Sequence, residues 1–155
     1  MTRFYDIDAA NAAVAELDVI VGVLADQRAE LVRLRDEVLA GSGAGDGSTT
    51  AVADRATRPA DSTGSDAAVE PPIVDDLRLT RLRMQGLIDQ MAAGVARIDE
   101  LGLSLRDIEH GLVDFPALVA GRQIWLCWQR GETAIGWWHG LDTGFSGRRP
   151  LAELI

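Results

Sequence analysis

Apolar side chains recur at helical spacing in two long stretches of the chain. In the first stretch these positions are Ile7, Ala10, Val14, Leu17, Val21, Leu24, Leu31, Leu34 and Val38. In the second stretch they are Ile73, Leu77, Met84, Leu87, Ile88, Met91, Val95, Ile98 and Leu101. Spacings of three and four residues place such side chains on one face of a helix, so the pattern predicts helices over residues 6–39 and 73–101.

The residues around these stretches indicate how the two helices begin, end and connect. Asp6 stands where an N-cap is expected, and Gly102 is a typical C-terminal cap. Residues 41–72 between the helices are rich in Gly, Ser, Thr, Ala and Asp and contain no aromatic residue. Such a segment buries too little apolar surface to offset the entropy lost on ordering, so we expect a disordered acidic linker. A long linker allows antiparallel pairing, and we expect a coiled-coil-like helical hairpin.

The pattern changes after Gly102. Residues 103–121 are interrupted by glycine and proline, which predicts short extended pieces and a turn. Residues 122–128 and 133–139 flank the sequence QRGE and predict two strands around a tight Arg130-Gly131 turn, of which the first is apolar on both faces. The predicted fold class is therefore α+β, mainly α. It is a single domain over residues 1–155, in which a long antiparallel two-helix hairpin carries a small C-terminal β-hairpin within segment 103–155.

Charge restricts the classes of partner. The chain has a formal net charge of −9, and residues 121–155 are the one segment that is not acidic. An acidic surface argues against binding to a nucleic-acid backbone or to an anionic membrane, and no apolar run is long enough for a transmembrane helix. A small anionic ligand at the C-terminal segment is compatible with this charge distribution.

The residue types that are rare or missing restrict cofactors and location. All fifteen basic residues are arginine, so Schiff-base catalysis, a pyridoxal-phosphate site and a P-loop lysine are excluded. The single cysteine, Cys127, excludes an internal disulfide and a thiolate-rich metal cluster. No cofactor is implied by any motif. A lone thiol in an apolar run and a first segment unlike a signal peptide lead us to expect a cytoplasmic protein.

A site that combines Cys127 with His139 is disfavoured by the predicted strand register. A tight turn at Arg130-Gly131 would pair Cys127 with Ala134 and His139 with Arg122. The two side chains would then lie about 16 Å apart on opposite faces of the hairpin. We therefore expect Cys127 to be a small buried hydrophobic residue.

The favoured candidate site is the loop after the second predicted strand. His139, Asp142 and Arg148 are the candidate catalytic residues, because an imidazole, a carboxylate and a guanidinium can bind an anion or transfer protons. The candidate metal ligands are His139, Asp142 and Asp114. The candidate ligand or partner surface consists of Trp138, Phe145, Arg149 and Asp114. A structural role stays open for all of them: Asp142 as a turn cap, Arg148 paired with Asp114 or Asp142, and His139 hydrogen-bonded to a carbonyl.

Several motifs of the chain occur together in one known family. They are an aromatic residue and Ala-Asn in Arg3–Leu17, GLVDFP in Gly111–Leu118, LCW in Leu126–Trp128, and WHxLDxGFxGRxP in Trp138–Leu151. In this order they resemble the bacterial family of unknown function DUF2203. The resemblance covers nearly the whole chain apart from the linker, and it implies no activity.

Two functional hypotheses follow from the sequence. The leading one is a non-enzymatic interaction or oligomerisation module that forms a homodimer through its helices. In that hypothesis a protein or small ligand docks at the tryptophan-rich end, which holds Trp125, Trp128, Trp137 and Trp138. The alternative is a small-ligand-binding protein or enzyme that uses His139, Asp142 and Arg148, with or without a divalent metal.

Overall fold

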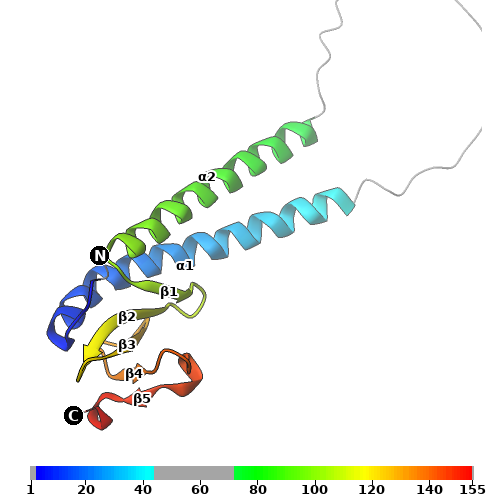
Figure 1. The fold of residues 1–155 in the computed structure, drawn as a ribbon. Helices are drawn as coiled ribbons and strands as arrows, with labels where there is room; N and C mark the ends of the chain where they lie inside the picture. Colours follow the sequence, from blue (N-terminus) through cyan, green and yellow to red (C-terminus); the bar gives the residue numbers. More distant parts are fainter. Residues whose placement is uncertain (1–2, 44–71, 155) are drawn as a thin grey trace, which may run out of the picture.

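The computed structural model describes the backbone of residues 3–43 and 72–154 (Figure 1). It contains two long helices, α1 (Ile7–Gly43) and α2 (Pro72–Glu100). Five strands follow: β1 (Ser104–Asp107), β2 (Leu112–Val119), β3 (Arg122–Gln129), β4 (Trp137–His139) and β5 (Arg149–Pro150). Short 3-10 helices lie at Phe145–Gly147 and Leu151–Glu153. Most of the predicted linker over residues 41–72 lies outside the described residues.

Local capping contacts fix the ends of the helices. At the start of α1, Asp6 Oδ1 accepts a hydrogen bond of 2.7 Å from the backbone N–H of Ala9. The helix continues to Gly43 rather than to Leu39. At the end of α2, Gly102 adopts a φ of +75°, and the Leu103 N–H donates to the Ile98 carbonyl at 3.2 Å. These contacts satisfy backbone groups that a helix end would otherwise leave unpaired.

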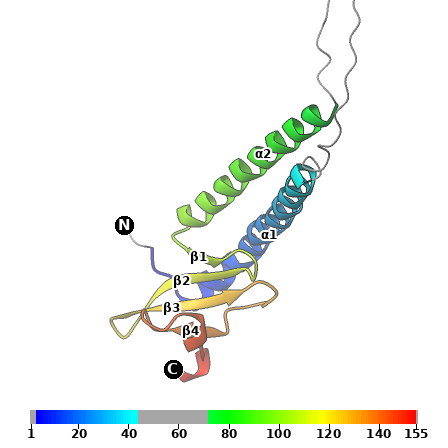
Figure 2. The same cartoon turned by 90° about the vertical axis from the view of Figure 1, so that its right-hand side faces the viewer.

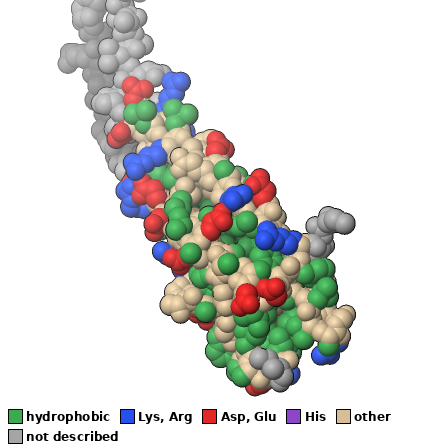
Figure 3. Space-filling view, turned by 90° about the vertical axis from the view of Figure 1, so that its left-hand side faces the viewer, with side chains coloured by type: hydrophobic (Ala, Val, Ile, Leu, Met, Phe, Trp, Pro, Cys, Tyr) green, Lys and Arg blue, Asp and Glu red, His purple; other side chains and the backbone are tan. Residues whose placement is uncertain are grey.

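The two helices lie side by side and run in opposite directions (Figures 1 and 2). Polar pairs join them in antiparallel order: Glu16 with Arg97, Gln27 with Gln90, and Glu30 with Arg83. The helices approach closely at Gly94, where a Cβ atom would lie 2.8 Å from Leu24 Cδ2. Side chains of both charge signs cover the helices, and hydrophobic side chains gather at the wider end of the molecule (Figure 3). Among the described helices, none is long and apolar enough to cross a membrane.

The C-terminal part forms a five-stranded antiparallel sheet in the order β1-β2-β3-β4-β5. The sheet is therefore larger than the predicted two-stranded hairpin, which corresponds to β3 and β4. Strands β1 and β2 occupy the segment predicted as short extended pieces. A two-residue turn joins β2 to β3, with Ala120 and Gly121 at φ of 50° and 76°. Pro116 is tolerated inside β2 because the pairing of β2 with β1 extends only as far as Asp114. The Pro116 carbonyl instead accepts a hydrogen bond from the Tyr5 N–H at 2.8 Å.

One face of the sheet packs against α1 and forms the core. Alternate residues of β2 and β3 supply the sheet side of this core: Val113, Phe115, Ala117, Ile124, Leu126 and Trp128. The helix side consists of Ala10, Val14, Leu17, Val21 and Leu24. The N-terminal part of α1 lies behind β2 and β3 in Figure 2. Because side chains alternate along a strand, the intervening residues of β2 and β3 point to the opposite face, away from α1.

Candidate functional site

The segment between β3 and β4 decides which side chains share the face of the sheet opposite α1. The turn itself lies where the sequence predicts it, with Gly131 at a φ of +97° and the Glu132 N–H donating to the Gln129 carbonyl at 3.0 Å. However, β4 does not begin until Trp137. Cys127 consequently pairs with Trp137 instead of Ala134, and His139 pairs with Trp125 instead of Arg122.

Contacts with the core and with α1 explain why β4 begins only at Trp137. Ile135 is 5% exposed within the core, and its N–H donates to Asn11 Oδ1 of α1 at 2.7 Å. The Glu132 carbonyl accepts a hydrogen bond of 2.9 Å from Trp128 Nε1. These contacts hold residues 132–136 out of the sheet.

The change of register reverses the predicted relation between Cys127 and His139. A register shift by an odd number of residues exchanges the two faces of a strand. His139 therefore lies on the same face of the sheet as Cys127. The expectation that the two residues lie about 16 Å apart on opposite faces is wrong.

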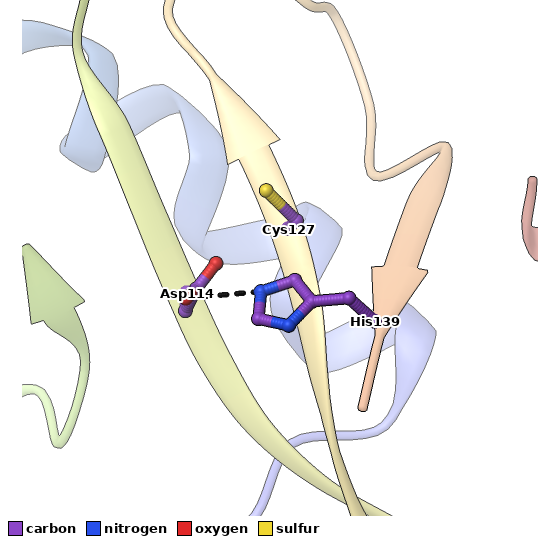
Figure 4. Close-up of side chains that lie close together, drawn as sticks. All are labelled: Asp114, Cys127 and His139. Carbon is purple, nitrogen blue, oxygen red and sulfur yellow. Dashed lines mark ion pairs between the residues drawn. The ribbon is translucent and has the colours of Figure 1, made fainter. Parts of the chain in front are cut away.

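Asp114, Cys127 and His139 form a buried cluster on three neighbouring strands (Figure 4). Asp114 of β2 lies opposite Cys127 of β3, and His139 closes the group from β4. One carboxylate oxygen, the sulfur and one imidazole nitrogen all lie within 4.8 Å of one another. The three residues are only 2%, 1% and 2% exposed.

The hydrogen bond of the His139 ring fixes which nitrogen faces the cluster. Nδ1 lies 2.7 Å from the Gly140 carbonyl oxygen, which can only accept, so Nδ1 carries the hydrogen. In the neutral ring, Nε2 then presents a lone pair. Nε2 lies 3.1 Å from Asp114 Oδ2, yet it is buried without a partner of hydrogen-bond geometry among the described residues.

Arg106 completes the surroundings of Asp114. A bulge between Leu105 and Asp107 of β1 places Arg106 beside β2, where its Nε donates to Asp114 Oδ2 at 2.7 Å. Its guanidinium carbon lies 5.0 Å from the centre of the Trp125 ring. The aromatic contact and the ion pair together orient this guanidinium beside the buried carboxylate.

Cys127 is held in its protonated form. Burial, followed by the negative charge of Asp114, raises the pKa of the thiol to about 12. A thiol with this pKa is a poor nucleophile at neutral pH, which argues against cysteine-based covalent catalysis. A metal ion would change this balance, because thiol ligands lose their proton when they bind a metal.

Asp114, Cys127 and His139 line one side of a cavity of about 200 Å³. Leu112, Leu141 and Phe145 provide its apolar lining, and Arg106 is also part of the wall. Gly144 of the loop that follows β4 contributes as well. The arrangement combines nitrogen, oxygen and sulfur ligand atoms with open space next to them.

The structure brings some of the candidate residues to this cavity and keeps others away. His139, Asp114 and Phe145 line it, whereas Asp142 is exposed in the turn after β4 and Arg148 does not reach it. Of the proposed metal ligands, Asp114 and His139 lie in the cluster, with Cys127 instead of Asp142 as the third.

Arg148 has a separate set of contacts. Its side chain is 12% exposed and pairs with Glu132 at 2.7 Å, rather than with Asp114 or Asp142. The guanidinium carbon lies 5.0 Å from the Trp137 ring centre and 4.9 Å from that of Phe145. These contacts attach the loop after β4 to the segment between β3 and β4.

The remaining aromatic candidates divide between core and surface. Arg149 lies over Trp138 at 5.8 Å, and Trp138 packs against the core. Trp128 is fully buried, whereas Trp137 is 37% exposed. The tryptophan-rich end therefore contributes mainly to the packing of the fold.

Arg106 and Glu132 are not among the residues that the sequence predicts for a site, and Cys127 is predicted as a small buried hydrophobic residue. Asp114 gave a usable signal, because a single acid inside the apolar run LVDFPALV requires a buried partner. Ile135 gave another, since it is the one large apolar residue between Gly131 and Trp137.

The comparison with protein families agrees with the motifs of the sequence. The model of a family described as "Uncharacterized conserved protein (DUF2203)" matches residues 3–151. The chain belongs to the DUF2203 family. No curated protein and no solved structure is significantly similar to this DUF2203 protein. Any function of the cluster must therefore be argued from its own geometry.

Proposed function

We propose that this DUF2203 protein binds a divalent transition metal ion, of which Zn²⁺ is the best match, through Asp114, Cys127 and His139. The observation that carries the proposal is the buried Nε2 of His139, which has no hydrogen-bond partner in the part of the chain that the structure describes while it faces a carboxylate and a thiol. In the neutral ring, lone pairs of Nε2 and Asp114 Oδ2 face each other at 3.1 Å and repel. A cation bound by both atoms removes this repulsion.

The competing explanation is an ion pair between protonated His139 and Asp114. That pair would place a proton between Nε2 and Oδ2, in hydrogen-bond geometry. The observed contact is close but lacks this geometry. The Cys127 sulfur also lies beside both groups, where it can act as a third ligand of a metal ion.

The types of ligand and their supports suit zinc. Zn²⁺ prefers sulfur, nitrogen and oxygen ligands, and three protein ligands leave a fourth position open. A metal-binding imidazole commonly donates its other N–H to a carbonyl, as His139 does to Gly140. Arg106 similarly fixes the Asp114 carboxylate. A reduced thiol ligand requires a reducing compartment, which supports a cytoplasmic location.

The test is titration of chelator-treated protein with Co²⁺, a spectroscopic substitute for Zn²⁺. We expect a saturable sulfur-to-cobalt charge-transfer band, together with an increase in unfolding free energy of about 2.7 kcal/mol at a hundredfold excess over Kd. Asp114→Asn, Cys127→Ser and His139→Gln should each abolish or strongly weaken the band. Circular dichroism of each variant establishes that it is folded.

The matched control is His110→Gln, which removes the other histidine of the chain. His110 is exposed and contacts Asp107. This variant should bind Co²⁺ like the unmodified protein. Absence of the band in the unmodified protein, or equal behaviour of His110→Gln and folded His139→Gln, would refute the metal site.

A second candidate function, self-association, is favoured by the surface of the helices. Large apolar side chains are exposed there, with Val19 at 66%, Leu79 at 64% and Leu82 at 63%. Hydrophobic side chains lie among the charged ones along the helix pair in Figure 3. We propose that α1 and α2 act as a coiled-coil-like hairpin whose exposed apolar side chains pair with those of a second copy of the chain. Trp137 and Phe145 would be the exposed contacts for a protein partner at the tryptophan-rich end.

Sedimentation equilibrium over a range of concentrations tests self-association. Leu79→Glu and Leu82→Glu should convert a dimer to a monomer, because each buries an unpaired charge in the interface. Leu118→Glu is the control, since Leu118 is 52% exposed but lies on β2 and not on a helix. A monomer at all concentrations would contradict this candidate and leave the metal site unaffected.

A further inference from the structure

We infer that the metal site is the floor of a binding site for a small carboxylate anion with a short apolar group, held by the metal ion and Arg106. This inference rests on the proposed metal site and specifies its ligand. It starts from the cavity of about 200 Å³ that lies against Asp114, Cys127 and His139. With three protein ligands on one side, the open coordination position of the metal would face this cavity.

Arg106 provides the second contact for an anion. Its Nε is used by Asp114, but within residues 3–43 and 72–154 neither terminal amino group has a protein acceptor. Arginine carries five N–H donors, so the terminal groups remain able to bind a carboxylate. The side chain is 47% exposed and is oriented by Trp125, so it lies where an entering ligand would meet it.

The charge of the loaded site favours an anion. A divalent ion bound by Asp114 would compensate the carboxylate, which leaves the charge of Arg106 available to an anion. Without the metal, Arg106 is paired with Asp114. Anion binding should therefore depend on the metal, and the two should bind cooperatively.

The lining of the cavity selects the class of anion. Leu112, Leu141 and Phe145 form the wall beside the ligand atoms, and Leu141 and Phe145 are 52% and 47% exposed in the structure. The side chains of these three residues carry no donors for the further oxygens of a phosphate, whereas they suit an apolar group. An engineered cavity of about 150 Å³ binds benzene, so the cavity here admits a ligand of roughly that size. Nucleotides and other large anions do not fit.

The experiment uses the full chain loaded with Co²⁺ and follows the visible spectrum of the ion. Benzoate, acetate and inorganic phosphate are the probes. We expect saturable spectral changes with benzoate, about tenfold weaker binding of acetate because it buries less apolar surface, and phosphate weaker than benzoate. Phe145→Ala should reduce the advantage of benzoate over acetate.

Arg106→Gln tests the second contact. Measured on protein saturated with Co²⁺, it should weaken benzoate binding by about tenfold or more, the usual effect of losing a charged hydrogen bond. Arg106→Lys should recover part of the affinity. Arg122→Gln is the matched control, because Arg122 is exposed at the start of β3 and should have no effect.

The outcomes separate this inference from the proposal on which it rests. If Co²⁺ binds but no probe changes its spectrum, the anion site is refuted and the metal site stands. Equal benzoate affinity in Arg106→Gln and Arg122→Gln also refutes it, and tighter binding of phosphate than of benzoate refutes the carboxylate class. If Co²⁺ does not bind, the metal site itself fails and this inference fails with it.

Discussion

Cys127 lies between a carboxylate and an imidazole, yet it keeps its proton. Burial and the charge of Asp114 raise its pKa from 9.0 to about 12, so the thiol in the metal-free protein is neutral at physiological pH. Thiol chemistry at this position therefore depends on what else occupies the cluster. A metal ion converts the buried thiol to a ligand, whereas the metal-free protein should protect it from alkylation.

The raised pKa makes the stability of the metal-free protein depend on pH. Between about pH 9 and 12 the unfolded chain loses the thiol proton while the folded chain keeps it, so the unfolding free energy falls as pH rises. Below about pH 9 the contribution of the protonated Cys127 thiol to the unfolding free energy is present in full. Compared with Cys127→Ala, the unmodified protein should lose at most about 1.4 kcal/mol per pH unit in this range. Urea unfolding in chelator at several pH values measures the difference, and parallel profiles would contradict it.

Individual elements show where local sequence was sufficient to predict structure. The helices follow from their own periodicity and from Asp6 and Gly102, which contact backbone groups close in sequence. The register of β4 does not follow from local sequence. It depends on Ile135 entering the core and binding Asn11, a contact between residues 124 positions apart in the chain.

The candidate site was predictable only in part for the same reason. Asp114 and His139 stand out by residue type, but His139 reaches Asp114 and Cys127 only through the register of β4. Arg106 reaches Asp114 through a bulge in β1, which the residues 104–107 do not signal.

The turn between β2 and β3 contains a residue poorly suited to its backbone conformation. Ala120 has a φ of 50°, which glycine and asparagine adopt more readily than alanine. Ala120→Gly or Ala120→Asn should therefore raise the unfolding free energy by about 1 kcal/mol, as measured by urea denaturation. Val119→Ala, next to the turn, should not be stabilising. An unchanged or lower stability of both Ala120 variants would contradict this account of the turn.

Two glycines of α2 provide a matched test of the helix pairing. A Cβ atom at Gly94 would lie 2.8 Å from Leu24, whereas at Gly86 no heavy atom lies within 4 Å. Gly86→Ala should stabilise the protein by up to about 1 kcal/mol through helix propensity. Gly94→Ala should lose this gain, because Leu24 must move. Thermal unfolding compares the two, and equal melting temperatures would show that the helices do not pack closely at Gly94.

The whole molecule has its core at one end. Within the described residues, Leu34 is the one buried side chain of α1 beyond Leu24, and Ile98 is the one buried side chain of α2. The ends of the helices far from the sheet are therefore stabilised mainly by helix propensity and by exposed ion pairs, which contribute little each.

Hydrogen exchange should reveal this uneven distribution of stability. Amides of α1 beyond Leu34 and of α2 before Met84 should exchange at least about tenfold faster than those of β2 and β3, because they open locally. If the helices associate with a second copy, protection at these ends should rise with protein concentration while protection in the sheet stays constant. Uniform protection along the helices at low concentration would contradict the prediction.

The sheet separates two surfaces that need not change together. One of its faces is covered by α1, and the other carries Asp114, Cys127 and His139. A substitution on the outer side of the helices can alter what the protein associates with, and it leaves every ligand atom in place. A substitution around the cavity can alter what is bound there without disturbing the helices. The proposed association through the helices and the proposed metal site could therefore change independently in proteins built on this plan.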